Sequence, residues 1–259
     1  MSSEQSQLRT TLIGSLLDVA RRNRAQGASQ LRLFEAGAVY EPNGAAELPR
    51  EPHHLAAILS GPVRRASWRE PAPPPADFFA AKGVLGAVLE SLGASWSARR
   101  AHVPFLHPGR GAEILVGEEP AGWLGELHPS VVASCDLTDT VAGFELDLDA
   151  VPIPPATIYE DLTSFPEARE DLAVVVDEAV TAAEVLRTVR AAGGPLLASA
   201  EVFDVYVDAD RLGAGNVSLA IRLAYRAADR TLTDAEVARQ RQLITTALEG
   251  EVGGRVRAG

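Results

Sequence analysis

Cysteine is nearly absent from this sequence of 259 residues, in which Cys135 is the single example. One thiol excludes an internal disulfide, and such a chain is typical of a reducing compartment. Long apolar runs are also missing, since none approaches the roughly 20 residues that a helix needs to cross a bilayer. The N-terminal residues MSSEQSQLRTTL lack the cationic start and apolar stretch of a secretory signal. We therefore expect a cytoplasmic protein with no membrane partner.

Positive charge is also in short supply. The formal net charge is -11, and Lys82 is the only lysine among 24 basic residues. A chain this acidic is excluded from the general polyanion binders, which depend on counterion release by many cations. Any contact with nucleic acid must therefore be local, through a few arginines, hydroxyl groups and a stacking ring.

Length and the placement of proline predict two domains. A chain of 259 residues with 46% hydrophobic content suits one large or two ordinary globular domains with buried cores. The run Pro152-Ile153-Pro154-Pro155 disfavours both a helix and a central strand, so it is the expected boundary. We predict a first domain over residues 1–153 and a second over residues 157–259.

The apolar pattern of the first domain predicts helices and strands in mixed order. Leu8, Leu12 and Leu16 recur at four-residue steps, which indicates a helix over residues 6–25 that ends before Gly27. Asp77 is a good N-cap for a helix over residues 78–92. Further expected elements are strands at 31–39, 53–59 and 141–148, a hairpin of 112–116 with 122–128, and a helical turn at 129–134.

The second domain has a simpler predicted order. Thr181 caps an expected helix over residues 182–192, and the capping box Thr233-Asp234-Ala235-Glu236 opens another that reaches about residue 248. The expected strands are 171–176, 201–207, 217–225 and a short one at 255–257. This β-α-β-β-α-β order is that of ferredoxin-like domains.

Strand alternation predicts which residues share a face of the second sheet. Leu219, Ile221 and Leu223 fall on one face of the strand 217–225, and by the same rule Phe203 falls on the apolar face of its strand. Both helices of a ferredoxin-like domain cover the apolar face. The residues expected on the open face are Asp204, Tyr206, Ser218 and Arg222. Such a set suits stacking and hydrogen bonding to unpaired RNA bases, although ordinary polar residues on a solvated sheet would look the same.

Several motifs resemble one known family. The segments SFPEAREDLAVVVDE, FDVY and NVSLAIRLAYRAADRTLTDAEV resemble the anticodon-binding domain at the end of the phenylalanyl-tRNA synthetase beta chain. Upstream, SSEQSQLRTTLIGSLLDVARRN, LRLFEAGAVY, FLHPGRGAEILV and WLGELHP resemble the domain that precedes it. Family beta chains continue far upstream, with modules that include an editing domain. We therefore expect the chain to be the C-terminal part of such a subunit.

The resemblance implies a fold and a set of site residues. It implies an α+β chain in which a class II synthetase-like antiparallel sheet domain precedes a ferredoxin-like domain. In the family, the acid and ring of the FD-x-Y motif and the serine of the next strand face the anticodon; they match Asp204, Tyr206 and Ser218. Arg222 joins them through strand alternation. The implied partners are tRNA(Phe) and the alpha subunit, in a heterotetramer for the full enzyme.

The resemblance also implies that the first domain is not catalytic. LRLFE resembles the strand on which active synthetases carry an Arg-x-Glu ATP-binding motif, but two residues rather than one separate Arg32 from Glu35. A glycine-rich segment ending in arginine, which would supply the other adenylate-binding motif, is missing. We therefore expect a scaffold that binds no cofactor itself, while the complete enzyme uses ATP and magnesium on its alpha subunit.

A metal site, an anion site and a different class of function are less well supported by the sequence. His102, His107 and His128 with Glu126 do not have the spacing of a zinc site. The turn at residues 107–110 suits either a bound anion or a plain entry into a strand. A different class of function is a stand-alone module whose ferredoxin-like domain binds a protein or a small effector.

Overall fold

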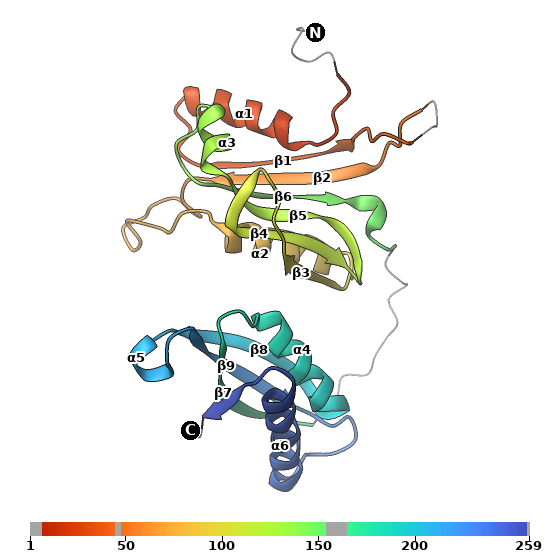
Figure 1. Ribbon diagram of the computed structural model, residues 1–259, viewed down its shortest axis with the longest axis vertical. Helices are drawn as coiled ribbons and strands as arrows, with labels where there is room; N and C mark the ends of the chain where they lie inside the picture. Colours follow the sequence, from red (N-terminus) through yellow and green to blue (C-terminus); the bar gives the residue numbers. More distant parts are fainter. Residues whose placement is uncertain (1–6, 45–47, 154–164, 258–259) are drawn as a thin grey trace. The chain divides into compact units, whose positions relative to one another are not determined.

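The computed structural model describes residues 7–44, 48–153 and 165–257 (Figure 1). The chain divides into two compact units, Met1–Ala156 and Thr157–Gly259. The proline run expected at the boundary lies partly outside the described residues, which stop at Ile153 and resume at Phe165.

An antiparallel six-stranded sheet forms the centre of the first unit, with the strand order β1-β2-β6-β5-β4-β3. Its strands are β1 (Leu31–Ala38), β2 (His53–Ser60), β3 (Trp96–Arg100), β4 (Leu106–Val116), β5 (Glu119–Leu127) and β6 (Val141–Asp147). Its helices are α1 (Ile13–Ala25), α2 (Phe78–Ser91) and α3 (Pro129–Ser134), followed by the 3-10 turn η2 (Leu148–Ala150).

Helices cover both faces of this sheet. Leu85 and Leu89 of α2 pack on one face with Phe144, while α1 and α3 lie on the other face (Figure 1). Successive residues of β2 alternate between the two cores, with Ala57 in one and Ile58 in the other. A strand buried on both faces needs a continuous apolar run, which explains the sequence HHLAAILS.

The first helix is shorter than the sequence predicts. It begins at Ile13, not near residue 6, because the preceding residues are held by other elements. The Tyr40 amide donates to the Arg9 carbonyl, and the Leu12 amide donates to the Glu145 carboxylate. These non-local hydrogen bonds replace the helical ones that the leucine spacing indicates. Strand β3, at the sheet edge, was not predicted at all.

The second unit is a four-stranded antiparallel sheet with the order β10-β7-β9-β8. Its elements are β7 (Ala168–Asp177), α4 (Ala182–Gly193), η3 (Gly194–Leu196), β8 (Leu197–Tyr206), α5 (Ala209–Leu212), β9 (Asn216–Tyr225), α6 (Asp234–Glu251) and β10 (Arg255–Arg257). Val185 and Val189 of α4, with Ile244 of α6, pack against Ile221 and Leu223. Both helices therefore cover one face, and the predicted ferredoxin-like order is confirmed.

Two details of this unit differ from the prediction. The register between β8 and β9 shifts between Val202 and Asp204, so Phe203 is an extra residue in a β-bulge. Strand alternation breaks at such a residue, and the expected place of Phe203 on the helix-covered face is wrong. The segment after β8 also contains the short helix α5, capped by Asp208, where the polar sequence predicts only a loop.

Candidate nucleic-acid interface

The open face of the second sheet brings the predicted residues together through strand register. Tyr206 pairs with Ser218, and Asp204 pairs with Ala220. Residues opposite each other on antiparallel strands point to the same face. Arg222 lies further along that face, opposite Glu201 on β8. The four candidates therefore share the face that α4 and α6 leave uncovered, although their surroundings differ.

Tyr206 is held in place by Asp208. Its hydroxyl donates a 2.5 Å hydrogen bond to Oδ2 of Asp208, and 38% of the residue is exposed. The other carboxylate oxygen, Oδ1, accepts hydrogen bonds of 3.0 Å from the amides of Asp210 and Arg211. The hydrogen bond between the two side chains raises the pKa of Tyr206 and lowers the pKa of Asp208. One carboxylate thus caps α5 and fixes the phenol.

Ser218 is on the expected face but is buried, with only 5% of its surface exposed. Val175, which pairs with Ser218 from the neighbouring strand β7, is also buried. Leu212 of α5 is buried as well. Leu212 also lies close to the edge strand β10, because its carbonyl oxygen accepts a 3.4 Å hydrogen bond from Nη2 of Arg255. The serine therefore belongs to the floor of the surface, whereas Asp204 and Tyr206 are displayed on it.

The Arg222 side chain contacts residues of its own sheet. Its Nε and Nη2 lie 3.1 and 3.2 Å from the two carboxylate oxygens of Asp171, and this ion pair raises the pKa of Arg222. Its guanidinium also lies over the Phe203 ring, 4.5 Å from the ring centre. Phe203, 46% exposed, is thus a second ring on the open face. Its position could not be predicted, because nothing in the local sequence marks the bulge.

Arg32 and Glu35 of the first unit are occupied by internal contacts. Arg32 donates to the carbonyls of Pro62 and Val63. Glu35 accepts hydrogen bonds from Ser15 and Arg9. Burial acts to raise the pKa of Glu35, but these hydrogen bonds outweigh it and leave the pKa lowered. The two residues that resemble part of an ATP-binding motif therefore brace the sheet edge.

Two buried carboxylates are likewise satisfied within the first unit. Glu145, 3% exposed, accepts from the Leu12 amide at 3.1 and 3.2 Å and from the Thr11 hydroxyl, and its Oε1 lies 2.8 Å from Nδ1 of His54. Glu126 is 5% exposed. It accepts from the Phe78 amide at 3.2 Å and from Arg110 at 2.6 Å. These acids anchor helices and strands to one another.

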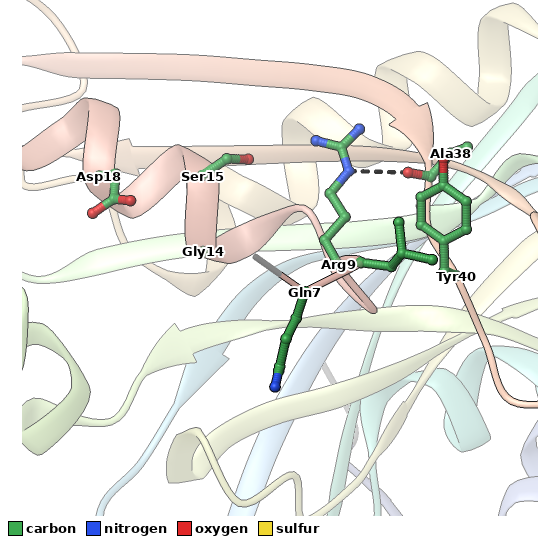
Figure 2. Close-up of a pocket in the computed structure, with 8 residues that line it drawn as sticks. Gln7, Arg9, Gly14, Ser15, Asp18, Ala38 and Tyr40 are labelled. Atoms are coloured by element: carbon green, nitrogen blue, oxygen red, sulfur yellow. Dashed lines mark hydrogen bonds between the residues drawn. The ribbon is translucent and has the colours of Figure 1, made fainter. Parts of the chain in front are cut away.

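A surface depression of about 620 Å³ lies beside α1. Figure 2 shows Arg9 reaching across it, where its Nε donates to the Ala38 carbonyl at 3.0 Å. Ser15 and Asp18 line the helix side, and Tyr40 lines the other. The charged group of Arg9 is thus used internally, and the depression adds no free catalytic set.

Two of the candidate histidines, His107 and His128, have local structural roles. Nδ1 of His128 accepts from the Ser130 amide at the start of α3, and Nδ1 of His107 accepts from the Gly109 amide. Among the described residues no group of three or more histidines, cysteines or acids is placed to hold a metal ion. Residues 107–110 lie within β4, where the pairing with β5 is irregular. No helix in the described part of the chain is long and apolar enough to cross a membrane.

Family comparisons match both units separately. Residues 1–148 match the family described as the phenylalanyl tRNA synthetase beta chain CLM domain. Residues 163–257 match the ferredoxin-fold anticodon binding domain. One solved structure with similarity is a pyrrolysyl tRNA synthetase of Desulfitobacterium hafniense, at a TM-score of 0.41 and 17% identity, covering 55% of this chain and 48% of that one.

Relatives in bacteria are similar along nearly the whole chain. The phenylalanine–tRNA ligase beta subunit of Symbiobacterium thermophilum is 42% identical over 92% of the chain, and that of Moorella thermoacetica is 41% identical over 99%. These matches cover 27% and 32% of the relatives, so the chain spans about a third of the length of the curated proteins it matches. By its two matched domains and these relatives, the chain belongs to the phenylalanyl-tRNA synthetase beta-chain family.

Proposed function

We propose that this chain is the C-terminal part of a phenylalanine–tRNA ligase beta subunit, and that its second unit binds the anticodon of tRNA(Phe). The observation that carries the proposal is the open sheet face of a ferredoxin-fold anticodon-binding domain. On it, the Tyr206 ring is held by Asp208 and the Asp204 carboxylate is exposed. An aromatic ring and a hydrogen-bonding acid are groups that recognise unpaired bases.

In this proposal the four candidate residues have different roles. Tyr206 provides a stacking surface, and Asp204 accepts hydrogen bonds from base edges. Ser218, being buried, sets the depth of the floor next to Tyr206. Arg222 is neutralised by Asp171, so it orients the Phe203 ring and is not a free phosphate contact.

The first unit acts in the proposal as a scaffold for the catalytic alpha subunit. Arg32, Glu35 and Glu145 are all engaged in internal contacts, which leaves them unsuited to hold ATP or magnesium. Exposed apolar side chains, among them Phe34 and Phe79, offer surface for a protein partner. ATP-dependent attachment of phenylalanine to tRNA would take place on the alpha subunit, in a cytoplasmic heterotetramer. Co-expression with a cognate alpha subunit should give a complex that co-purifies.

Aminoacylation by the complete ligase containing this chain tests the anticodon assignment. The charging rates of native tRNA(Phe) and of the same tRNA with a substituted anticodon are compared. We expect a lower kcat/KM for the substituted tRNA, and Asp204→Asn should reduce the difference between the two. Equal charging of both by the unsubstituted ligase would contradict the proposal and favour a protein- or effector-binding module.

A further inference from the structure

Two arginines of the C-terminal strand lie on the open face of the second sheet. β10 pairs with β7 so that Arg255 is opposite Val175 and Arg257 is opposite Ala173. Val256, between the two arginines, instead packs on the helix-covered core. Both guanidinium-bearing residues are exposed. The edge strand therefore adds two cations to the face that carries Asp204 and Tyr206.

Continuous register across four strands places these residues in two parallel rows. One row consists of Arg255, Val175, Ser218 and Tyr206, and the other of Arg257, Ala173, Ala220 and Asp204. Neighbouring strands lie about 4.8 Å apart, so roughly 14 Å separates the two edges. The second row has arginine at one end, an acid at the other and a floor of two alanines between them.

Charge is distributed unevenly across this face. The Arg257 side chain makes no hydrogen bond or ion pair to another described residue, and the Arg255 side chain makes one long hydrogen bond, 3.4 Å from Nη2 to the Leu212 carbonyl oxygen. At the opposite edge, β8 carries the exposed acids Glu201 and Asp204. Arg222, between the edges, is paired with Asp171. Positive charge without an acidic partner among the described residues thus lies along β10. Acids without a basic partner lie along β8, where Asp204 accepts a 2.9 Å hydrogen bond from the Val205 amide.

We infer that an RNA segment bound on this face runs with its phosphates along β10, against Arg255 and Arg257, and directs its bases over Ala173 and Ala220 toward Asp204. The inference rests on the proposed function. Phosphates would be repelled by the acids of β8 and attracted to the arginines, whereas an acid suits the amino groups of base edges. The small alanine side chains permit a base or ribose to approach the sheet closely.

This orientation assigns phosphate contacts and base contacts to different residues, and a mutational study can distinguish the two. Phosphate contacts contribute affinity that is independent of sequence and falls with added salt, whereas base contacts determine which anticodon is preferred. Arg255 and Arg257 are therefore positioning residues. Loss of one phosphate contact to single-stranded RNA lowers the slope of log affinity against log salt concentration by about 0.7.

The test measures equilibrium binding of tRNA(Phe) by the complete ligase over a series of salt concentrations, with the native and a substituted anticodon. Arg257→Gln should weaken binding of both tRNAs several-fold, by the same factor, and reduce the salt slope by about 0.7. Arg257→Lys should keep the slope because it keeps the charge. Arg239→Gln, which removes an exposed arginine from helix α6 on the covered side, should change neither quantity.

Three results would overturn the inference. An unchanged salt slope in Arg257→Gln, with anticodon preference intact, would remove β10 from the interface and leave the proposed function standing. A change of anticodon preference without a change of slope would mean that Arg257 contacts a base, which reverses the orientation. If the unsubstituted ligase binds both tRNAs equally, the proposed function itself fails and the inference fails with it.

Discussion

The Tyr206 hydroxyl and the Asp208 carboxylate are joined by a 2.5 Å hydrogen bond that links the end of β8 to helix α5. Because Oδ1 of Asp208 also accepts hydrogen bonds from the amides of Asp210 and Arg211, the carboxylate that holds the Tyr206 hydroxyl is itself fixed by the helix cap. A ring that is already oriented loses less conformational freedom when it stacks on a base.

Removal of the Tyr206 ring should weaken tRNA recognition without unfolding the second unit. Tyr206→Ala eliminates a stacking surface worth about 1–3 kcal/mol, and the ring lies on the face away from the helices. Aminoacylation kinetics of the complete ligase should show a raised KM for tRNA with phenylalanine activation unchanged. Tyr206→Phe keeps the ring and loses only the hydrogen bond to Asp208. Its KM for tRNA should therefore lie between that of the unsubstituted ligase and that of Tyr206→Ala. An alanine variant with unchanged KM would exclude stacking at this position.

Truncation of Ile221, unlike that of Tyr206, should lower the stability of the second unit. Ile221 is fully buried beneath α4 and α6, so Ile221→Ala should cost about 2–5 kcal/mol of the free energy of unfolding. Val205 is the matched control: its partner Leu219 faces the core, yet 55% of Val205 is exposed, and Val205→Ala should cost about 0.5 kcal/mol or less. Denaturant unfolding of the two variants measures the difference. Equal losses would show that the helices cover the sheet more widely than the structure has it.

The stability of the second unit should decrease at low pH through Glu236. Hydrogen bonds from the Thr233 backbone, Arg230 and the Thr233 hydroxyl lower the pKa of Glu236 from 4.5 to about 2. A carboxyl group whose pKa is depressed on folding contributes stability above its unfolded pKa, and this contribution is lost as the pH falls toward the folded value. The loss should therefore occur between about pH 4.5 and pH 2.

Glu236→Gln is the variant that isolates this effect. Glutamine can still complete the capping box with Thr233 but does not ionise or pair with Arg230. The variant should be less stable than the parent at neutral pH, and the difference should shrink as the pH approaches 2. Thermal unfolding of the variant and the parent at several pH values measures this difference in stability. A difference that stays constant over this range would contradict the lowered pKa.

Glu145 should be essential for the stability of the first unit. Glu145→Ala leaves the buried Leu12 amide without its acceptor and also removes the partner of Thr11, at about 1–3 kcal/mol for each buried group left unsatisfied. Hydrogen exchange at the Leu12 amide should accelerate more than exchange at amides in the middle of β6. Glu119→Ala, at an exposed site on β5, is the control and should have little effect.

Purified without an alpha subunit, the chain should not catalyse phenylalanine-dependent exchange between ATP and pyrophosphate. Arg32 is bound to backbone carbonyls and Glu35 is bound to Arg9 and Ser15, so neither is free to hold a nucleotide. Exchange above background would refute the scaffold role. The mixture with a cognate alpha subunit is the positive control.

The capping boxes and strand alternation were readable from the sequence because they depend on residues close together in the chain. Thr181 bonds to Glu184 and Thr233 bonds to Glu236, each pair three residues apart, and both helices begin where the motifs indicate. In β9, alternation correctly placed Ile221 in the core. Such local preferences are fixed by backbone geometry, whatever the rest of the chain does.

Tertiary structure alone decided how the candidate site is composed. The bulge that places Phe203 beside Arg222 arises from the pairing of β8 with β9, and Arg222 is neutralised by Asp171, a residue 51 positions away. Strand order likewise brings Arg257 onto the face of Asp204. The sequence by itself determined which residues could face outward together. Which of them stay exposed, charged and free depends on contacts between distant segments, and such contacts form only when the whole sheet has assembled.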